Sequence, residues 1–212
     1  MNRIDLSSRR VGYSRTVKLL HWLLAAGVGA QLLFSLVMQQ PRPGRVRSLL
    51  ESAFFSTHEV LGLSILALLT LHWLLWLAGR TSRGIGQFYP WFSRTRRAAL
   101  GVELRALARL RLGEPEAQEN LAGAVQGIGI AIASLLAVTG TLLYFGMAPD
   151  GSMSAGLRAV REVHKALATG MWTYLGIHAG AALAHVALGH RSVLDIFRLR
   201  AAERPERPCE SS

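Results

Sequence analysis

The stretch VHKALATGMWTYLGIHAGAALAH, residues 163–185, is apolar enough for a lipid bilayer and still carries three histidines. Ionisable side chains inside a membrane are costly and usually mark function. His164 and His178 are 14 residues apart. Fourteen residues are close to four helical turns, so the two side chains project from nearly one helix face, about 21 Å apart along the axis. The stretch therefore predicts a spanning helix with two functional sites, one toward each membrane surface.

The rest of the chain contains further apolar segments of similar length. Half of the 212 residues are hydrophobic. A helix needs about 20 apolar residues to cross the hydrocarbon of a bilayer, and helix is the spanning structure that satisfies its own backbone hydrogen bonds. The predicted spans are Val17–Met38, Ala53–Ala78, Leu121–Met147 and His164–Leu188. The predicted fold is an all-α, integral membrane four-helix bundle over residues 1–200, followed by a disordered cytoplasmic tail at 201–212.

The formal net charge of +11 raises the possibility of nucleic-acid binding, but the distribution of basic residues argues against it. With four spans, 18 of the 24 Lys and Arg residues fall on the side that holds both termini. Basic residues are enriched in cytoplasmic segments, and they also attract anionic lipid. The expected location is the bacterial inner membrane, multi-pass, with both termini cytoplasmic. The polar first 16 residues precede a retained first helix rather than a cleaved signal peptide.

The segment 79–119 is the largest one between spans. Leu100, Leu104 and Leu107 share one helical face there, with arginines on the others. This pattern predicts an amphipathic helix on the cytoplasmic membrane surface. The single cysteine, Cys209, lies in the tail, and no CxxCH sequence is present, which excludes a covalently attached c-type haem.

The histidines and glycines together favour redox centres between the helices. His58 and His72 repeat the 14-residue spacing of His164 and His178. Two neutral imidazoles from facing helices can hold a haem iron without a covalent anchor. By depth, His58 and His164 should pair near the periplasmic side, whereas His178 could pair with either His72 or His21. Small residues either make room for a porphyrin or allow close helix packing: Gly27, Gly29, Gly62, Gly127, Gly129, Gly140, Gly176 and Gly180.

Three stretches in this order carry a family resemblance: YSRTVKLLHWLL (13–24), THEVLGLSILALL (57–69) and residues 163–185. Over about residues 13–200 the chain resembles the bacterial cytochrome b561 family, which includes the related cytochrome b subunits of nickel–iron hydrogenases. The resemblance implies two b haems. His21 and His178 would ligate the haem on the cytoplasmic side, and His58 and His164 the haem on the periplasmic side.

The sequence also departs from the family. His72 stands where the family commonly has an arginine, so a His72–His178 pair, similar to the cytochrome b of respiratory bc complexes, is an alternative. Gln126 stands where a histidine is common, which puts quinone or proton chemistry at that place in doubt. Together with His185, Gln126 could instead border a quinone pocket.

Basic residues near the ligands are candidate partners of the haem propionates. Arg15 and Lys18 would serve the cytoplasmic-side haem, and Arg161 and Lys165 the periplasmic-side haem. The alternative is that these side chains simply extend to the membrane interface.

The predicted function is electron relay between the quinone pool and another carrier. A catalytic partner such as a hydrogenase or dehydrogenase would then perform the chemistry. Two alternatives remain: a self-contained quinol-oxidising enzyme that reduces oxygen or superoxide, and a haem-free membrane scaffold or transporter. The expected ligands are two b haems, quinone and membrane lipid.

Overall fold

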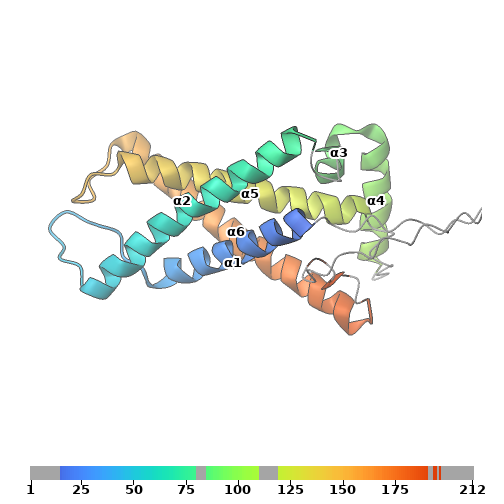
Figure 1. The fold of residues 1–212 in the computed structure, drawn as a ribbon, viewed down its shortest axis with the longest axis horizontal. Helices are drawn as coiled ribbons and strands as arrows, with labels where there is room; N and C mark the ends of the chain where they lie inside the picture. Colours follow the sequence, from blue (N-terminus) through green and yellow to red (C-terminus); the bar gives the residue numbers. More distant parts are fainter. Residues whose placement is uncertain (1–14, 80–84, 110–118, 191–192, 195, 197–212) are drawn as a thin grey trace, which may run out of the picture.

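The computed structural model describes residues 15–79, 85–109, 119–190, 193–194 and 196, and no strand occurs within them. Four long helices dominate this part of the chain (Figure 1): α1 (Arg15–Val37), α2 (Leu49–Leu77), α5 (Glu119–Gly146) and α6 (Ala155–Ala187). Between α2 and α5 lie the short α3 (Ile85–Phe88), the 3₁₀ helix η1 (Pro90–Phe92) and α4 (Arg94–Ala108). The all-helical prediction is confirmed, and each of the four predicted spans lies on a long helix except for its last residue.

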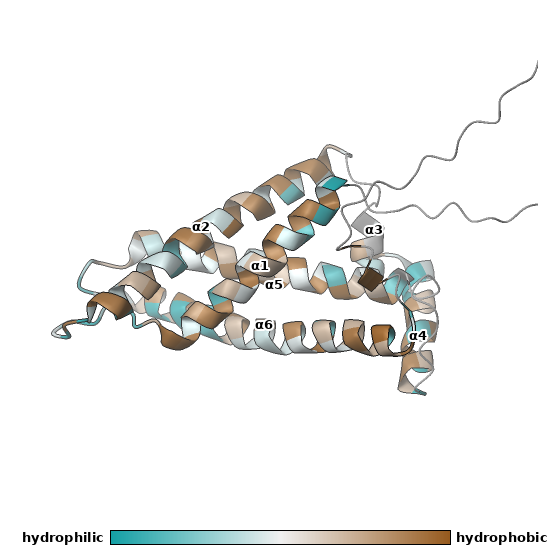
Figure 2. Cartoon of the chain, turned by 60° about the horizontal axis from the view of Figure 1, so that its bottom comes forward, coloured by the Kyte–Doolittle hydropathy of each residue, from teal (hydrophilic) through white to brown (hydrophobic). Residues whose placement is uncertain are grey.

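Three of the long helices have the composition of membrane spans. Among the described residues, α1, α2 and residues Asn120–Gly146 of α5 are long and apolar enough to cross a bilayer. Helix α6 has 33 residues but is less apolar, since charged residues near its start, histidines and hydroxyl side chains dilute its hydrophobic ones. Hydrophobic residues cover several sides of α1 and α2 (Figure 2), and Leu33 and Leu36 of α1 are 60% and 67% exposed. Such outward apolar surface is expected for helices that face lipid. The fourth span remains a prediction.

Helix boundaries coincide with capping residues. Ser48 precedes α2, and its hydroxyl accepts the Glu51 backbone N–H, while the Glu51 carboxylate accepts the Ser48 N–H, which forms a capping box. Ser154 caps the start of α6 by accepting from the N–H of Leu157. Serine caps are favourable because the first turn of a helix has unpaired N–H groups.

The long helices alternate in direction. The α1–α2 and α5–α6 loops lie at the same end of the molecule, and α3 and α4 lie at the other (Figure 1). The two loops touch at Gly151, where φ is +83° and a Cβ atom would overlap the carbonyl of Pro41. Glycine suits this position because it combines a left-handed conformation with close backbone approach.

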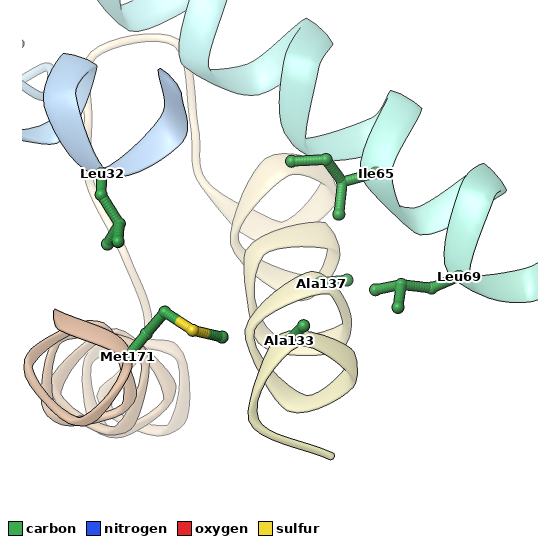
Figure 3. Close-up of a cluster of buried hydrophobic side chains, with 6 residues drawn as sticks. All are labelled: Leu32, Ile65, Leu69, Ala133, Ala137 and Met171. Carbon is green, nitrogen blue, oxygen red and sulfur yellow. The ribbon is translucent and has the colours of Figure 1, made fainter. Parts of the chain in front are cut away.

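The long helices meet in a small apolar cluster to which each of them contributes (Figure 3). Helix α5 is the middle element of the packing, against both α2 and α6. It presents alanines there, which let neighbouring helices approach closely. The buried members are Leu32, Ile65, Leu69, Ala133, Ala137 and Met171.

Helix α4 occupies the segment predicted to form an amphipathic helix. Its Glu103 carboxylate accepts hydrogen bonds from the Asn120 side chain at 2.8 Å and from the Leu121 backbone N–H at 2.6 Å. Glu103 therefore satisfies donors in the first turn of α5 and holds α4 against it. The placement of α4 on a cytoplasmic membrane surface remains a prediction. The predicted tail at 201–212, with Cys209, lies outside the described residues.

Candidate functional site

The structure brings His21 of α1 and His178 of α6 together. Their ring centroids are 6.5 Å apart, and the ring planes meet at 61°. On another side, the His178 ring stacks on Tyr174, with centroids 5.5 Å apart and planes within 11°. Tyr174 lies one turn earlier on α6, so its ring restricts the rotation of the imidazole.

This pair could hold one metal ion between its two rings. If each imidazole bound through one nitrogen at roughly 2 Å, the ring centres would lie about 6 Å apart. The observed 6.5 Å is close to this value. The donors are neutral nitrogen ligands from two helices, the chemistry that a noncovalent haem requires.

His58 of α2 and His164 of α6, the second predicted pair, lie near enough to interact electrostatically. The Nδ1 atom of His164 lies 2.8 Å from the hydroxyl of Thr139 on α5. The backbone carbonyl of His58 accepts a hydrogen bond of 2.9 Å from the Gln31 amide of α1. Two buried polar atoms here have no hydrogen-bond partner among the described residues, the Nδ1 of His58 and the Oε1 of Gln31.

Within the described residues no ring contact joins His72 to His21 or His178. His72 extends the buried stripe of Ile65 and Leu69 on α2 and is 9% exposed. Its ring lies edge-on to that of Trp73, the next residue, with the ring centroids 6.4 Å apart. The ring contacts of His178 within the described residues are with His21 and Tyr174, not with His72.

The four basic residues predicted to meet propionates differ in environment. Lys18 is buried at 9% exposure, whereas Arg15 is exposed. At the other end, Lys165 and Arg161 both contact the exposed Glu162, at 3.0 and 2.9 Å. Hydrogen bonds from Lys165 and Arg161 lower the pKa of the Glu162 carboxyl below its usual value. Exposed ion pairs of this kind contribute little stability and exchange readily for another anion.

Gln126 and His185, the two residues predicted to border a quinone pocket, form no hydrogen bond with each other within the described residues. His185 contacts His190 instead, with the Nδ1 atoms 3.2 Å apart. Gln126 is half-buried on α5.

The glycines divide into two groups. A Cβ at Gly129 would overlap the Tyr174 phenol, and one at Gly140 would lie 3.2 Å from Cε1 of His164. These two glycines accommodate side chains next to the candidate ligands. Close contacts also surround Gly27, Gly62 and Gly127. Open space surrounds Gly29, Gly176 and Gly180.

Three residues of the site were not predicted from the sequence: Gln31, Thr139 and Tyr174. Tyr174 could have been noticed because it precedes His178 by one helical turn. Thr139 and Gln31 act between helices, so their roles depend on rotations that one sequence does not reveal. Polarity within an apolar span was the available signal.

Apolar helices that bring histidines together in pairs define a class of membrane haem proteins. The family model described as prokaryotic cytochrome b561 matches residues 12–198. The chain therefore belongs to the prokaryotic cytochrome b561 family, as the motifs predicted, and is a membrane protein that binds haem b and transfers electrons. No curated protein and no solved structure matches it.

Proposed function

We propose that the chain binds two b haems and relays electrons across the inner membrane between the quinone pool and another carrier. His21 and His178 hold one haem, and His58 and His164 hold the other. The observation that carries the proposal is the pairing itself. Helix α6 contributes one histidine to each pair, 14 residues apart, and α1 and α2 supply the two partners.

When bound, each haem accepts and releases one electron at a time. The chain supplies the imidazoles, separates the two sites by about four turns of α6, and excludes water between them. Met171 lies midway between His164 and His178 and is 2% exposed, packed with Leu32 and Ile65. A dry centre lets electrons cross while it opposes the passage of protons and ions.

Charged side chains at both ends suit the haem propionates. Lys18 lies one turn before His21 on α1 and is a buried basic residue, as suits the neighbourhood of a propionate. Arg161 and Lys165 flank His164, and their exposed contacts with Glu162 can give way to a propionate. Each haem thus has a cationic neighbour on the helix that supplies one of its ligands.

The end that holds α3 and α4 is assigned to the cytoplasm. It carries the greater share of basic residues, which favours the cytoplasmic side. Aromatic residues gather there: Trp73 stacks on Tyr89, and its indole N–H donates to Ser134 at 3.1 Å. Such residues are typical of the membrane–water interface. The His21–His178 haem is therefore the cytoplasmic one.

The test is a reduced-minus-oxidised optical spectrum of the purified protein together with haem quantification. Two low-spin b haems per chain are expected, and acid–acetone should extract both. His185→Ala is the matched control, because this histidine lies on α6 outside both pairs and its loss should leave the count at two. One haem per chain, or haem that resists extraction, contradicts the proposal.

A further inference from the structure

Helix α5 contributes none of the four proposed ligands, yet it touches His164 directly. The Thr139 Oγ1 atom lies 2.8 Å from the His164 Nδ1 atom. Both side chains are half-buried. A hydrogen bond between two spanning helices in a partly dry setting fixes the orientation of both partners.

The direction of this hydrogen bond follows from the other contact of the hydroxyl. Thr139 Oγ1 lies 2.7 Å from the backbone carbonyl oxygen of Leu135, which can only accept. The single hydroxyl proton is therefore used for that carbonyl, in the back-bonding common for threonine in helices. The oxygen then faces His164 with a lone pair, an arrangement that favours the Nδ1–H of His164 as the donor. In that tautomer Nε2 carries the free lone pair.

Gly140 completes the support of the ring. A Cβ at this position would lie 3.2 Å from Cε1 of His164, closer than comfortable contact. The backbone of α5 thus abuts the ring edge that carries Nδ1 and Cε1. The imidazole can neither flip freely nor bind a metal ion through Nδ1 while this contact persists.

We propose that Thr139 is a positioning residue for the haem ligand His164, holding the proton on Nδ1 so that Nε2 is the nitrogen available to iron. This inference rests on the proposed function. Acceptors beyond a ligating histidine fix its tautomer and make it a stronger donor. A stronger donor stabilises ferric iron, so Thr139 lowers the reduction potential of the periplasmic-side haem. In the same pair, the His58 Nδ1 atom has no hydrogen-bond partner among the described residues, so the two ligands are unequal.

The test compares Thr139→Val with Thr139→Ser, and Thr141→Val serves as the matched control. Thr141 also lies half-buried on α5 and back-bonds to a carbonyl, that of Ala137 at 2.8 Å. Potentiometric titration of each purified holoprotein should show one of two midpoint potentials raised in Thr139→Val. Thr139→Ser and Thr141→Val should keep the wild-type values. Loss of that haem on dilution should become about tenfold faster in Thr139→Val.

Several results would overturn the inference. Wild-type potentials in Thr139→Val would do so, as would an equal shift in Thr141→Val or in Thr139→Ser. If the valine variant does not accumulate, Thr139→Ala replaces it with the same expected shift. Failure of the underlying function looks different, since the wild-type protein itself would then lack two haems.

Discussion

Pairing of the histidines can be tested by counting haems in single and double variants. His21→Ala removes an imidazole whose ring centre lies 6.5 Å from that of His178. A bis-imidazole iron that loses one ligand becomes high-spin or leaves the protein. The expected result is a fall from two low-spin haems per chain to one. His178→Ala should give the same result.

The double variants are the stronger test. Two substitutions at ligands of the same haem remove only that haem, whereas substitutions at ligands of different haems remove both. His21→Ala combined with His178→Ala should still leave one low-spin haem. His21→Ala combined with His164→Ala should leave none, since each substitution removes a ligand from a different haem. Optical and electron paramagnetic resonance spectra of the purified proteins, with haem quantification, measure these counts. Added imidazole should restore the low-spin signal of His21→Ala if the haem is retained.

His72→Ala is the matched control for His21→Ala. The His72 ring is buried against Trp73 rather than against His178, so both haems should remain low-spin. Loss of the buried ring should still cost stability, on the order of 1–3 kcal/mol, measurable as a lower thermal midpoint in detergent. A high-spin haem in His72→Ala, with two low-spin haems in His21→Ala, would refute the pairing. The arrangement with two helices carrying all four ligands would then be correct.

Three further predictions concern packing and orientation. Gly129→Ala should displace Tyr174 and destabilise the holoprotein by about 1–3 kcal/mol. Gly176→Ala, whose Cβ would enter open space, should not destabilise it. Equal melting temperatures for the two variants would contradict this prediction. Glu103→Ala should lower the local stability of the first turn of α5 by about 1–2 kcal/mol, because N–H donors such as that of Leu121 lose their acceptor. Unchanged hydrogen exchange in this turn would argue against it. A reporter fused to the C-terminus should be active only if it is one that works in the cytoplasm, and periplasmic activity would reverse the topology.

The long helices could be predicted from the sequence because the bilayer imposes length and composition on any segment that crosses it. Helix α6 shows the limit of that reasoning. Its histidines made it the most informative stretch, and the same polar residues keep it less apolar than the other three. Polar residues that serve function lower the hydropathy of a span, so the residues that reveal its function also make the span harder to recognise.

The histidine pairs could be predicted only in part. Depth along the helices linked His58 with His164, because both lie near the same end of their spans. It left His21 and His72 open as partners of His178, since the choice depends on how α1 and α2 are rotated. In the structure, His72 continues the apolar face of α2 and His21 lies beside His178. Helix rotation arises from packing of all neighbours, which no local pattern encodes.

The two helices of the α5–α6 pair have different roles. Helix α6 carries one histidine of each proposed pair, and α5 contacts His164 and the Tyr174 ring that lies beside His178. Gly129 receives Tyr174, which stacks on His178, and Thr139 holds His164 by a hydrogen bond. Gly129 and Gly140, the glycines next to Tyr174 and His164, are 11 residues apart, about three turns, so these two contacts lie on one face of α5. In the proposed two-haem arrangement, a helix without ligands would set the orientation, and hence the potential, of both haems, and substitutions on that face should tune electron transfer without removing iron.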